Sequence, residues 1–187
     1  MNNKYLMSRN QNVNFIRQHL DDYLDYFMIL SKYEKDDPLY DKAYENFKNT
    51  YEFIMAEKDL PNDYHCLLKL HALLMDGLDD NINSTLTDDQ LEHLNLMINQ
   101  PTKSNTEVAI DVLLYILDKR LFSDGDVRSA IAFSNKILLD RGCGVIVILP
   151  RDKATFREKL KEFKDNKDTD FKQWVYKYCI KGKIYES

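Results

Sequence analysis

Long stretches of this chain contain neither glycine nor proline. Its 187 residues include only 5 Gly and 4 Pro, the residues that most often end or kink regular structure. Sandwiches and barrels of short strands need many such turn residues, so their scarcity favours helices. Because 44% of the residues are hydrophobic and 12% are aromatic, the chain can also bury a core. We therefore predict a mainly α protein of one domain.

The charge balance argues against several classes of protein. The chain has 26 Lys and Arg against 31 Asp and Glu, a net charge of -5, which argues against a general nucleic-acid binder. No stretch approaches the roughly 20 apolar residues of a membrane-spanning helix. The first residues lack the apolar core of a signal peptide. We expect a cytoplasmic protein that binds neither membrane nor nucleic acid.

Cysteine spacing and local charge add two expectations. The 3 Cys follow no zinc-site spacing and no disulfide framework, so we expect buried free thiols. Residues 151–187 carry eleven Lys and Arg against seven Asp and Glu, whereas the rest of the chain is acidic. This pattern is typical of a solvated helix surface, and the alternative is a face that meets an anionic partner.

The apolar residues recur at three- and four-residue steps along most of the chain, which is the pattern of amphipathic helices. The predicted helices cover about residues 13–33, 39–54, 64–76, 88–98, 108–117, 129–141, 156–163 and 171–178. We predict an N-terminal helical pair in residues 1–58 and a core with C-terminal helices in residues 59–187, together in a single compact unit.

Local signals mark several boundaries of these elements. Thr87 and Ser104 each begin a capping box, completed three residues later by Gln90 and Glu107. Residues 145–149 form the only convincing strand, and a proline stops it. A single strand needs a partner, for which the loop after residue 77 is a candidate.

The segment 120–128 resembles the signature of the Fic (Fido) family, which reads H-P-F-x-[D/E]-G-N-G-R. It joins two predicted core helices, and a Gly-Cys-Gly segment, a strand and a proline follow, as in many members. The helix that contains Leu70 and His71 and ends at Gly77 resembles the family's LH-containing helix. The resemblance covers about residues 60–180. It implies a Fic-like helical bundle with one short strand or hairpin.

The resemblance also implies a reaction, the transfer of a nucleoside monophosphate, usually AMP from ATP, to a hydroxyl group of a target protein. In that reaction the histidine is the base, the acidic residue holds Mg²⁺, and the Gly-Asn-Gly backbone and the arginine hold phosphate. Phe122 matches the apolar anchor of the motif, and Asp124 matches the Mg²⁺ ligand. The nucleotide- and phosphate-binding positions of the motif are occupied here by Gly125, Asp126, Val127 and Arg128.

Departures from the motif weaken the implied chemistry, beginning with Leu121 in place of proline. Arg120 stands at the histidine position and stays protonated, so it cannot act as a base. Asp126 replaces asparagine, and a carboxylate some 5 Å from a phosphate adds roughly 3 kcal/mol of repulsion at an effective dielectric near 20. Val127 adds a branched side chain where the backbone approaches the nucleotide. The leading interpretation is a pseudo-enzyme that binds or regulates a protein and binds ATP and Mg²⁺ weakly or not at all.

One alternative keeps the chain active as a nucleotidyl or related phosphate-group transferase. Asp124 and Asp126 would share a Mg²⁺ ion. The base would then come from another histidine, and the candidates are His65, His71 and His93. For His71, a packing role inside an apolar helix face is the competing interpretation. The Asp-Gly-Asp segment also hints at a calcium loop, although the spaced ligands of an EF-hand are missing.

A structural interpretation of the same segment needs no ligand. Salt bridges from Arg120 or Arg128 to Asp124 or Asp126 would close the loop. The family's inhibitory pattern, [S/T]-x-x-x-E-[G/N], is absent from this sequence. The family's target-docking flap would fall between residues 78 and 86 and could add to an extended partner segment. A homo-oligomer, or assembly with a related chain through the N-terminal helices, stays open.

Overall fold

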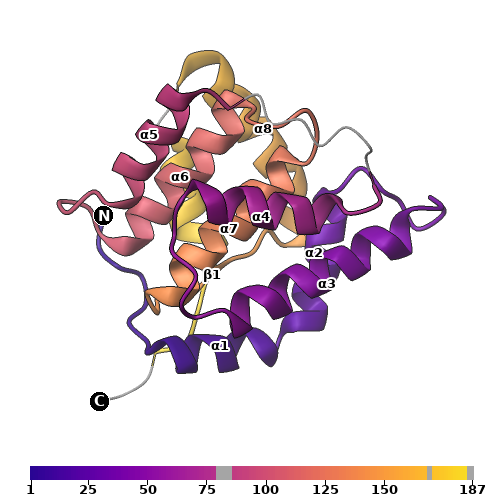
Figure 1. Ribbon diagram of the computed structural model, residues 1–187, viewed down its shortest axis with the longest axis horizontal. Coiled ribbons are helices and arrows are strands. Elements are labelled where there is room, and N and C mark those ends of the chain that lie inside the picture. The colour runs from indigo at the N-terminus through magenta and orange to yellow at the C-terminus, as the bar shows by residue number, and fades with distance from the viewer. Residues whose placement is uncertain (79–85, 168–169, 185–187) are drawn as a thin grey trace.

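The computed structural model describes residues 1–78, 86–167 and 170–184, and helices dominate these ranges (Figure 1). The helices are α1 (Arg9–Arg17), α2 (Leu20–Leu30), α3 (Tyr40–Ala56), α4 (Tyr64–Met75), α5 (Asp88–Ile98), α6 (Asn105–Lys119), α7 (Asp126–Asp140), α8 (Lys153–Asn166) and α9 (Asp170–Trp174). A short 3₁₀ turn, Pro150–Asp152, precedes α8, and a π-helical turn, Val175–Cys179, follows α9. The prediction of a mainly α protein is confirmed.

Helix α7 lies at the centre of the molecule, behind α4 and beside α6 in Figure 1. Every residue from 128 to 139 is buried, so this helix has no solvent-facing side over that length. A helix that is apolar around most of its circumference must be covered on all sides. Helices α1, α2, α3, α4 and α6 all contact it. The site described below lies at the N-terminal end of α7.

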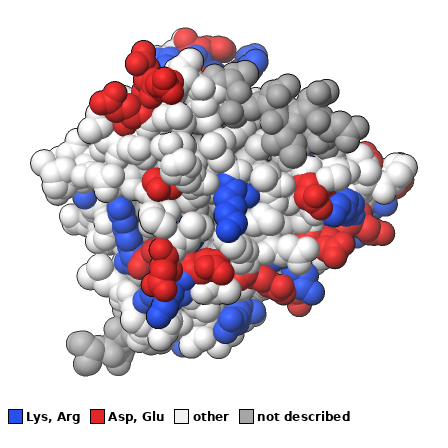
Figure 2. Space-filling view, viewed as in Figure 1, with Lys and Arg blue, Asp and Glu red and all other residues white. Residues whose placement is uncertain are grey.

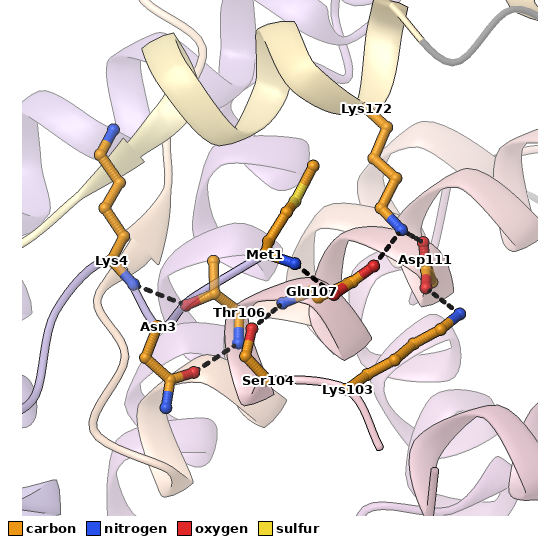
Figure 3. A network of polar contacts seen from close by, with 9 residues as sticks. All are labelled: Met1, Asn3, Lys4, Lys103, Ser104, Thr106, Glu107, Asp111 and Lys172. Atoms are coloured by element: carbon orange, nitrogen blue, oxygen red, sulfur yellow. Dashed lines mark hydrogen bonds and ion pairs between the residues drawn. The ribbon is translucent and has the colours of Figure 1, made fainter. Parts of the chain in front are cut away.

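The two predicted capping boxes differ in the structure. Thr87 and Gln90 form a complete box at the start of α5. Ser104 accepts a hydrogen bond from the backbone N–H of Glu107 at 3.1 Å, but the Glu107 carboxylate turns away to the N-terminal amine and to Lys172 (Figure 3). These two ion pairs lower the pKa of Glu107 to about 2. The second box is therefore only half formed, because longer-range charges attract the glutamate.

The prediction of one helix over residues 13–33 is wrong, because the chain breaks between α1 and α2. The His19 ring Nδ1 lies 2.9 Å from the carbonyl oxygen of Phe15, the atom that the His19 N–H would reach in a continuous helix. The His19 N–H donates instead to Ile16 at 3.1 Å. The N-terminal region thus holds three helices. Val13, Phe27 and other residues of these helices belong to the same core cluster as α6 and α7.

Among the described residues, the strand near residue 145 pairs with the C-terminal segment. Strand β1 (Val145–Ile146) is antiparallel to β2 (Ile180–Lys181), which follows the π-helical turn. The Asn135 side chain accepts from the N–H of Ile146 at 2.6 Å and donates to its carbonyl at 3.0 Å. A side chain from α7 therefore satisfies the backbone N–H and the carbonyl of Ile146 in β1. Residues 79–85, with most of the proposed flap, lie outside the described residues.

Two further expectations concern cysteines and membranes. All 3 Cys are buried and free. Among the described residues, no helix combines the length and the apolar character that crossing a bilayer requires. On the face shown in Figure 2, Lys and Arg side chains lie beside Asp and Glu side chains and not in one continuous basic patch.

Candidate functional site

The loop between α6 and α7 is anchored to the core by an aromatic pair. Phe122 is buried, and its ring stacks on that of His71 from α4, with the two centroids 3.6 Å apart and the planes at 11°. The His71 Nδ1 lies 2.8 Å from the Ser129 hydroxyl of α7. Phe122 thus takes the anchoring position that the motif predicts. His71 packs beneath the loop and is only 3% exposed.

Gly125 sits at the turn into α7, where both its backbone angle and its surroundings require glycine. Its φ is +79°, in the left-handed region that residues with a Cβ avoid. A Cβ built at this position would lie 2.7 Å from the Met75 sulfur. The loop therefore passes close to the end of α4.

Asp124 forms the main ion pair of the loop with a lysine from a distant part of the chain. The Lys32 Nζ, just after α2, lies 2.7 Å from the Asp124 Oδ2, and the Arg128 Nη2 lies 3.5 Å from the same oxygen. The Gly125 N–H donates to the other carboxylate oxygen at 2.7 Å. Burial raises the pKa of Asp124, but these three groups outweigh it and hold the pKa below its usual value. Asp124 is thus ionised and surrounded by donors of the chain itself.

Arg128 is the most deeply buried charged group of the loop, with 5% of its surface exposed. Its Nη2 donates to the Met75 sulfur at 2.9 Å, and the guanidinium lies 5.3 Å from the centre of the Tyr33 ring. Its Nη1 has no hydrogen-bond partner among the described residues. A buried donor without a partner is costly, and an absent ligand is one explanation for it.

Asp126 holds the loop together from within. Its Oδ1 accepts a hydrogen bond from the Phe122 N–H at 3.1 Å, which ties the first residue of α7 to the start of the loop. Burial raises the pKa of Asp126 to about 6, although the Phe122 N–H and the charges of Lys164 and Arg120 lower it. The Asp126 carboxylate thus stabilises the conformation of the loop by binding its backbone.

These residues surround a cavity of about 400 Å³, which we call the loop cavity. Four cations and two carboxylates line it, so its charge is positive. These charged residues are Lys32, Arg120, Asp124, Asp126, Arg128 and Lys164. The chain's four histidines all lie within the described ranges, and none lines this cavity. His65 and His93 are exposed elsewhere, so neither is placed to act as its base.

Comparison with known proteins rests on structure alone, because no family model and no curated protein matches the sequence. A solved structure, a Fic domain-containing signaling protein from Bacteroides thetaiotaomicron, is similar with a TM-score of 0.55. The likeness covers 91% of this chain and 80% of that protein at 17% sequence identity. This chain has a Fic-like fold.

In this Fic-like fold, the loop residues do not fit Mg²⁺ as they stand. Mg²⁺ demands near-octahedral oxygen ligands, usually one or two free carboxylates with water and phosphate. The Asp124 carboxylate is paired with Lys32, and the Asp126 carboxylate is bonded to the loop backbone. No group of three His, Cys, Asp or Glu within the described part of the chain is arranged to hold a metal.

The motif predicts the loop residues but not the two lysines from other elements that line the loop cavity of this Fic-like fold. Lys32 follows α2 and Lys164 belongs to α8, far from the motif in sequence. Neither carries a local signal, because lysines at such positions usually face solvent. Among the predicted salt bridges, that between Arg128 and Asp124 is present at 3.5 Å. Arg120, the exposed residue that ends α6 at φ 50°, lines the same cavity.

Proposed function

We propose that this chain is a protein-interaction module built on a Fic-like fold, a pseudo-enzyme that does not transfer nucleotides. The ion pair of 2.7 Å between Lys32 and Asp124 is the observation that carries the proposal. An ammonium group at that carboxylate takes the place that the family resemblance gives to Mg²⁺. The metal would have to displace a charge that the chain itself supplies.

The lack of a histidine in the lining of the loop cavity supports the same function. General bases work when their pKa lies near the operating pH, and an arginine is always protonated. Arg120 stands at the position where the motif has histidine. His71, the nearest histidine in the site's surroundings, lies under Phe122 and is occupied by contacts in the core. Neither residue is therefore placed to remove a proton from a target hydroxyl. Asp126 also lines the loop cavity and has a pKa of about 6, but its Oδ1 already accepts from the Phe122 N–H.

The partner that we propose is a protein and not a nucleic acid. The net charge of -5 gives the molecule no general attraction to phosphate backbones. The basic C-terminal region, residues 151–187, is the part of the chain best suited to meet an acidic protein surface.

A second function, a transferase with non-standard chemistry, has one observation in its favour. Arg128 lines the positively charged loop cavity, and its Nη1 has no hydrogen-bond partner among the described residues. Such a group suits a phosphate oxygen, because arginine binds phosphate through paired N–H donors. This function would require that Lys32 move away from Asp124.

A labelling experiment separates the two functions. The full chain is incubated with Mg²⁺, a cell extract and ATP labelled on its α-phosphate. We expect no labelled protein beyond the level seen with the Asp124→Ala variant. A labelled band that disappears in both Asp124→Ala and Arg128→Ala, but persists with the surface variant Asp165→Ala, would establish the transferase.

A further inference from the structure

A second and larger cavity lies next to the loop cavity, and the function proposed above does not use it. It measures about 600 Å³ and lies between α2, the segment that follows it, Tyr40 and α8, and we call it the α2–α8 cavity. It shares Ser31 and Lys32 with the loop cavity, and none of the motif positions 120–128 lines it. Any ligand that it holds would thus be bound by residues outside the Fic motif.

The lining of the α2–α8 cavity combines an apolar part with unpaired positive charge. Met28, Ile29, Tyr33 and Tyr40 supply the apolar part. Tyr33 is 4% exposed, and its hydroxyl finds no hydrogen-bond partner in residues 1–78, 86–167 or 170–184. The Tyr33 ring is covered by Lys32 and Arg128, which lie 5.4 and 5.3 Å from its centre. The partly exposed Tyr40 ring can pack on a planar ring of a ligand.

Three cations at this cavity form no ion pair with the described residues. They are Lys35, Lys153 and Arg157. By contrast, Lys32 at the shared wall is paired with Asp124. The two carboxylates of the lining, Asp25 and Glu34, leave the cavity with a positive balance.

The size and the charge of the α2–α8 cavity together indicate which class of ligand it can bind. Sites for small molecules typically occupy about 300–1,000 Å³ and contain a few polar groups that fix the orientation of the ligand. Arginine with neighbouring lysines suits a phosphate group better than a single carboxylate, because a phosphate offers more oxygens and more charge. We propose that the α2–α8 cavity binds an aryl phosphate, with its ring against Tyr40 and its phosphate on Lys153 and Arg157.

Isothermal titration of the full chain with phenyl phosphate tests this site, with inorganic phosphate and phenol as the two halves of the ligand. We expect phenyl phosphate to bind more tightly than either half. Arg157→Ala should weaken binding about 10- to 100-fold, as expected for loss of a charge-assisted hydrogen bond. Lys161→Ala, an exposed lysine of the same helix that lines neither cavity, should leave the affinity within about twofold, as is usual for a surface charge.

Two further titrations test where the ring of the ligand binds and whether the ligand comes from a protein or a small molecule. Tyr40→Leu should remove most of the preference for phenyl phosphate over inorganic phosphate. A phosphotyrosine peptide presents the same chemistry from a protein, so tighter binding of the peptide would identify a modified protein as the source, and equal binding a free small molecule. Both results support the site.

Other outcomes overturn the proposal. They are an absence of heat with millimolar phenyl phosphate, equal affinity for phenyl and inorganic phosphate, or no effect of Arg157→Ala. Loss of binding in Arg128→Ala alone would place the ligand in the loop cavity and also contradict this inference. None of these outcomes depends on Mg²⁺ or on labelling of a target, so this inference and the proposed function fail separately.

Discussion

The two ends of α7 each bury a cation, but the surroundings satisfy these cations differently. At the C-terminal end, Lys136 is completely buried, and its ammonium binds the Asp140 carboxylate and the Leu60 carbonyl, the latter at 3.1 Å. Asp140 also accepts from Arg9 and Asn62, each at 3.0 Å. A carboxylate at a helix C-terminus is normally unfavourable. Here three donors surround it, and it joins α1, α7 and the segment before α4.

At the N-terminal end, Arg128 keeps an unused donor. Its Nη1 lacks a partner in the described part of the chain, and the residue lines a cavity whose other walls carry more cations. The Lys136 ammonium binds a carboxylate and a carbonyl, whereas Arg128 keeps one donor without a partner among the described residues and lines a cavity. The first arrangement supports the fold, whereas the second leaves a buried donor that the described residues do not satisfy.

The largest expected effect concerns the C-terminal end. Asp140→Ala leaves the buried Lys136 without its counter-charge, and we expect a loss of about 3–5 kcal/mol in the free energy of unfolding. Urea denaturation measures it. The surface variant Asp165→Ala should change stability by no more than about 0.5 kcal/mol. A loss in Asp140→Ala as small as that of the control would show that this end does not support the fold.

The next effect concerns the turn into α7. Gly125→Ala places a methyl group at positive φ and 2.7 Å from the Met75 sulfur. We expect a loss of about 2–4 kcal/mol from backbone strain and overpacking together. Gly77→Ala is the matched control, because it has φ +65° but meets only the flexible end of Lys42, at 3.1 Å. Equal losses in the two variants would mean that the contact with Met75 contributes nothing.

A smaller effect is the pH dependence of stability that Asp126 causes at the N-terminal end of α7. Burial raises the pKa of Asp126 from 3.8 to about 6, so the folded state binds this proton more tightly than the unfolded state. Its contribution to stability is therefore present below the unfolded pKa and is lost as the pH rises through about 6. Asp126→Asn keeps an acceptor for the Phe122 N–H and should remove about 1–2 kcal/mol of this fall, after allowance for solvent screening. Urea denaturation at pH 4, 6 and 8 measures this difference. Equal losses of stability from pH 4 to pH 8 in the unchanged chain and in Asp126→Asn would contradict the prediction.

The smallest effect on stability concerns Lys32. Its side chain is 59% exposed, so Lys32→Ala should cost less than about 1 kcal/mol. The same variant should raise the pKa of Asp124, because the ion pair holds that pKa down. An NMR titration of the Asp124 carboxyl group measures the change. Lys42→Ala, which removes the ion pair with Asp76 of the same 2.7 Å length, should leave Asp124 unaffected. An unchanged Asp124 in Lys32→Ala would break the account of the loop.

The elements that the sequence predicts well are those fixed by neighbouring residues. The capping box of Thr87 and Gln90 marks the start of α5 within one turn of helix. The helix break at His19 has a local cause too, but a histidine bond to the preceding turn has no established sequence pattern. The sequence does not identify β2 as the partner of β1, because the two strands lie far apart in the chain.

In the candidate site too, features close together in sequence are predicted and those that depend on long-range packing are not. The motif comparison predicts Phe122 as the anchor and the ion pair of Arg128 with Asp124, since these residues are close in sequence. It gives no sign of Lys32 or of the α2–α8 cavity, which depend on how α2 and α8 pack around the loop. Long-range packing therefore decides whether the carboxylate of the motif faces a metal or a lysine.

Thermal shift with nucleotides tests whether Lys32 and Asp126 close the loop to Mg²⁺ and nucleotide. The full chain is titrated with ATP, CTP, UTP and GTP, each with and without Mg²⁺. A ligand at a hundredfold excess over its dissociation constant adds about 2.7 kcal/mol to the free energy of unfolding, which moves the melting temperature measurably. We expect no Mg²⁺-dependent shift with any of the four nucleotides. A Mg²⁺-dependent shift that is lost in Asp124→Ala and in Arg128→Ala would contradict the account.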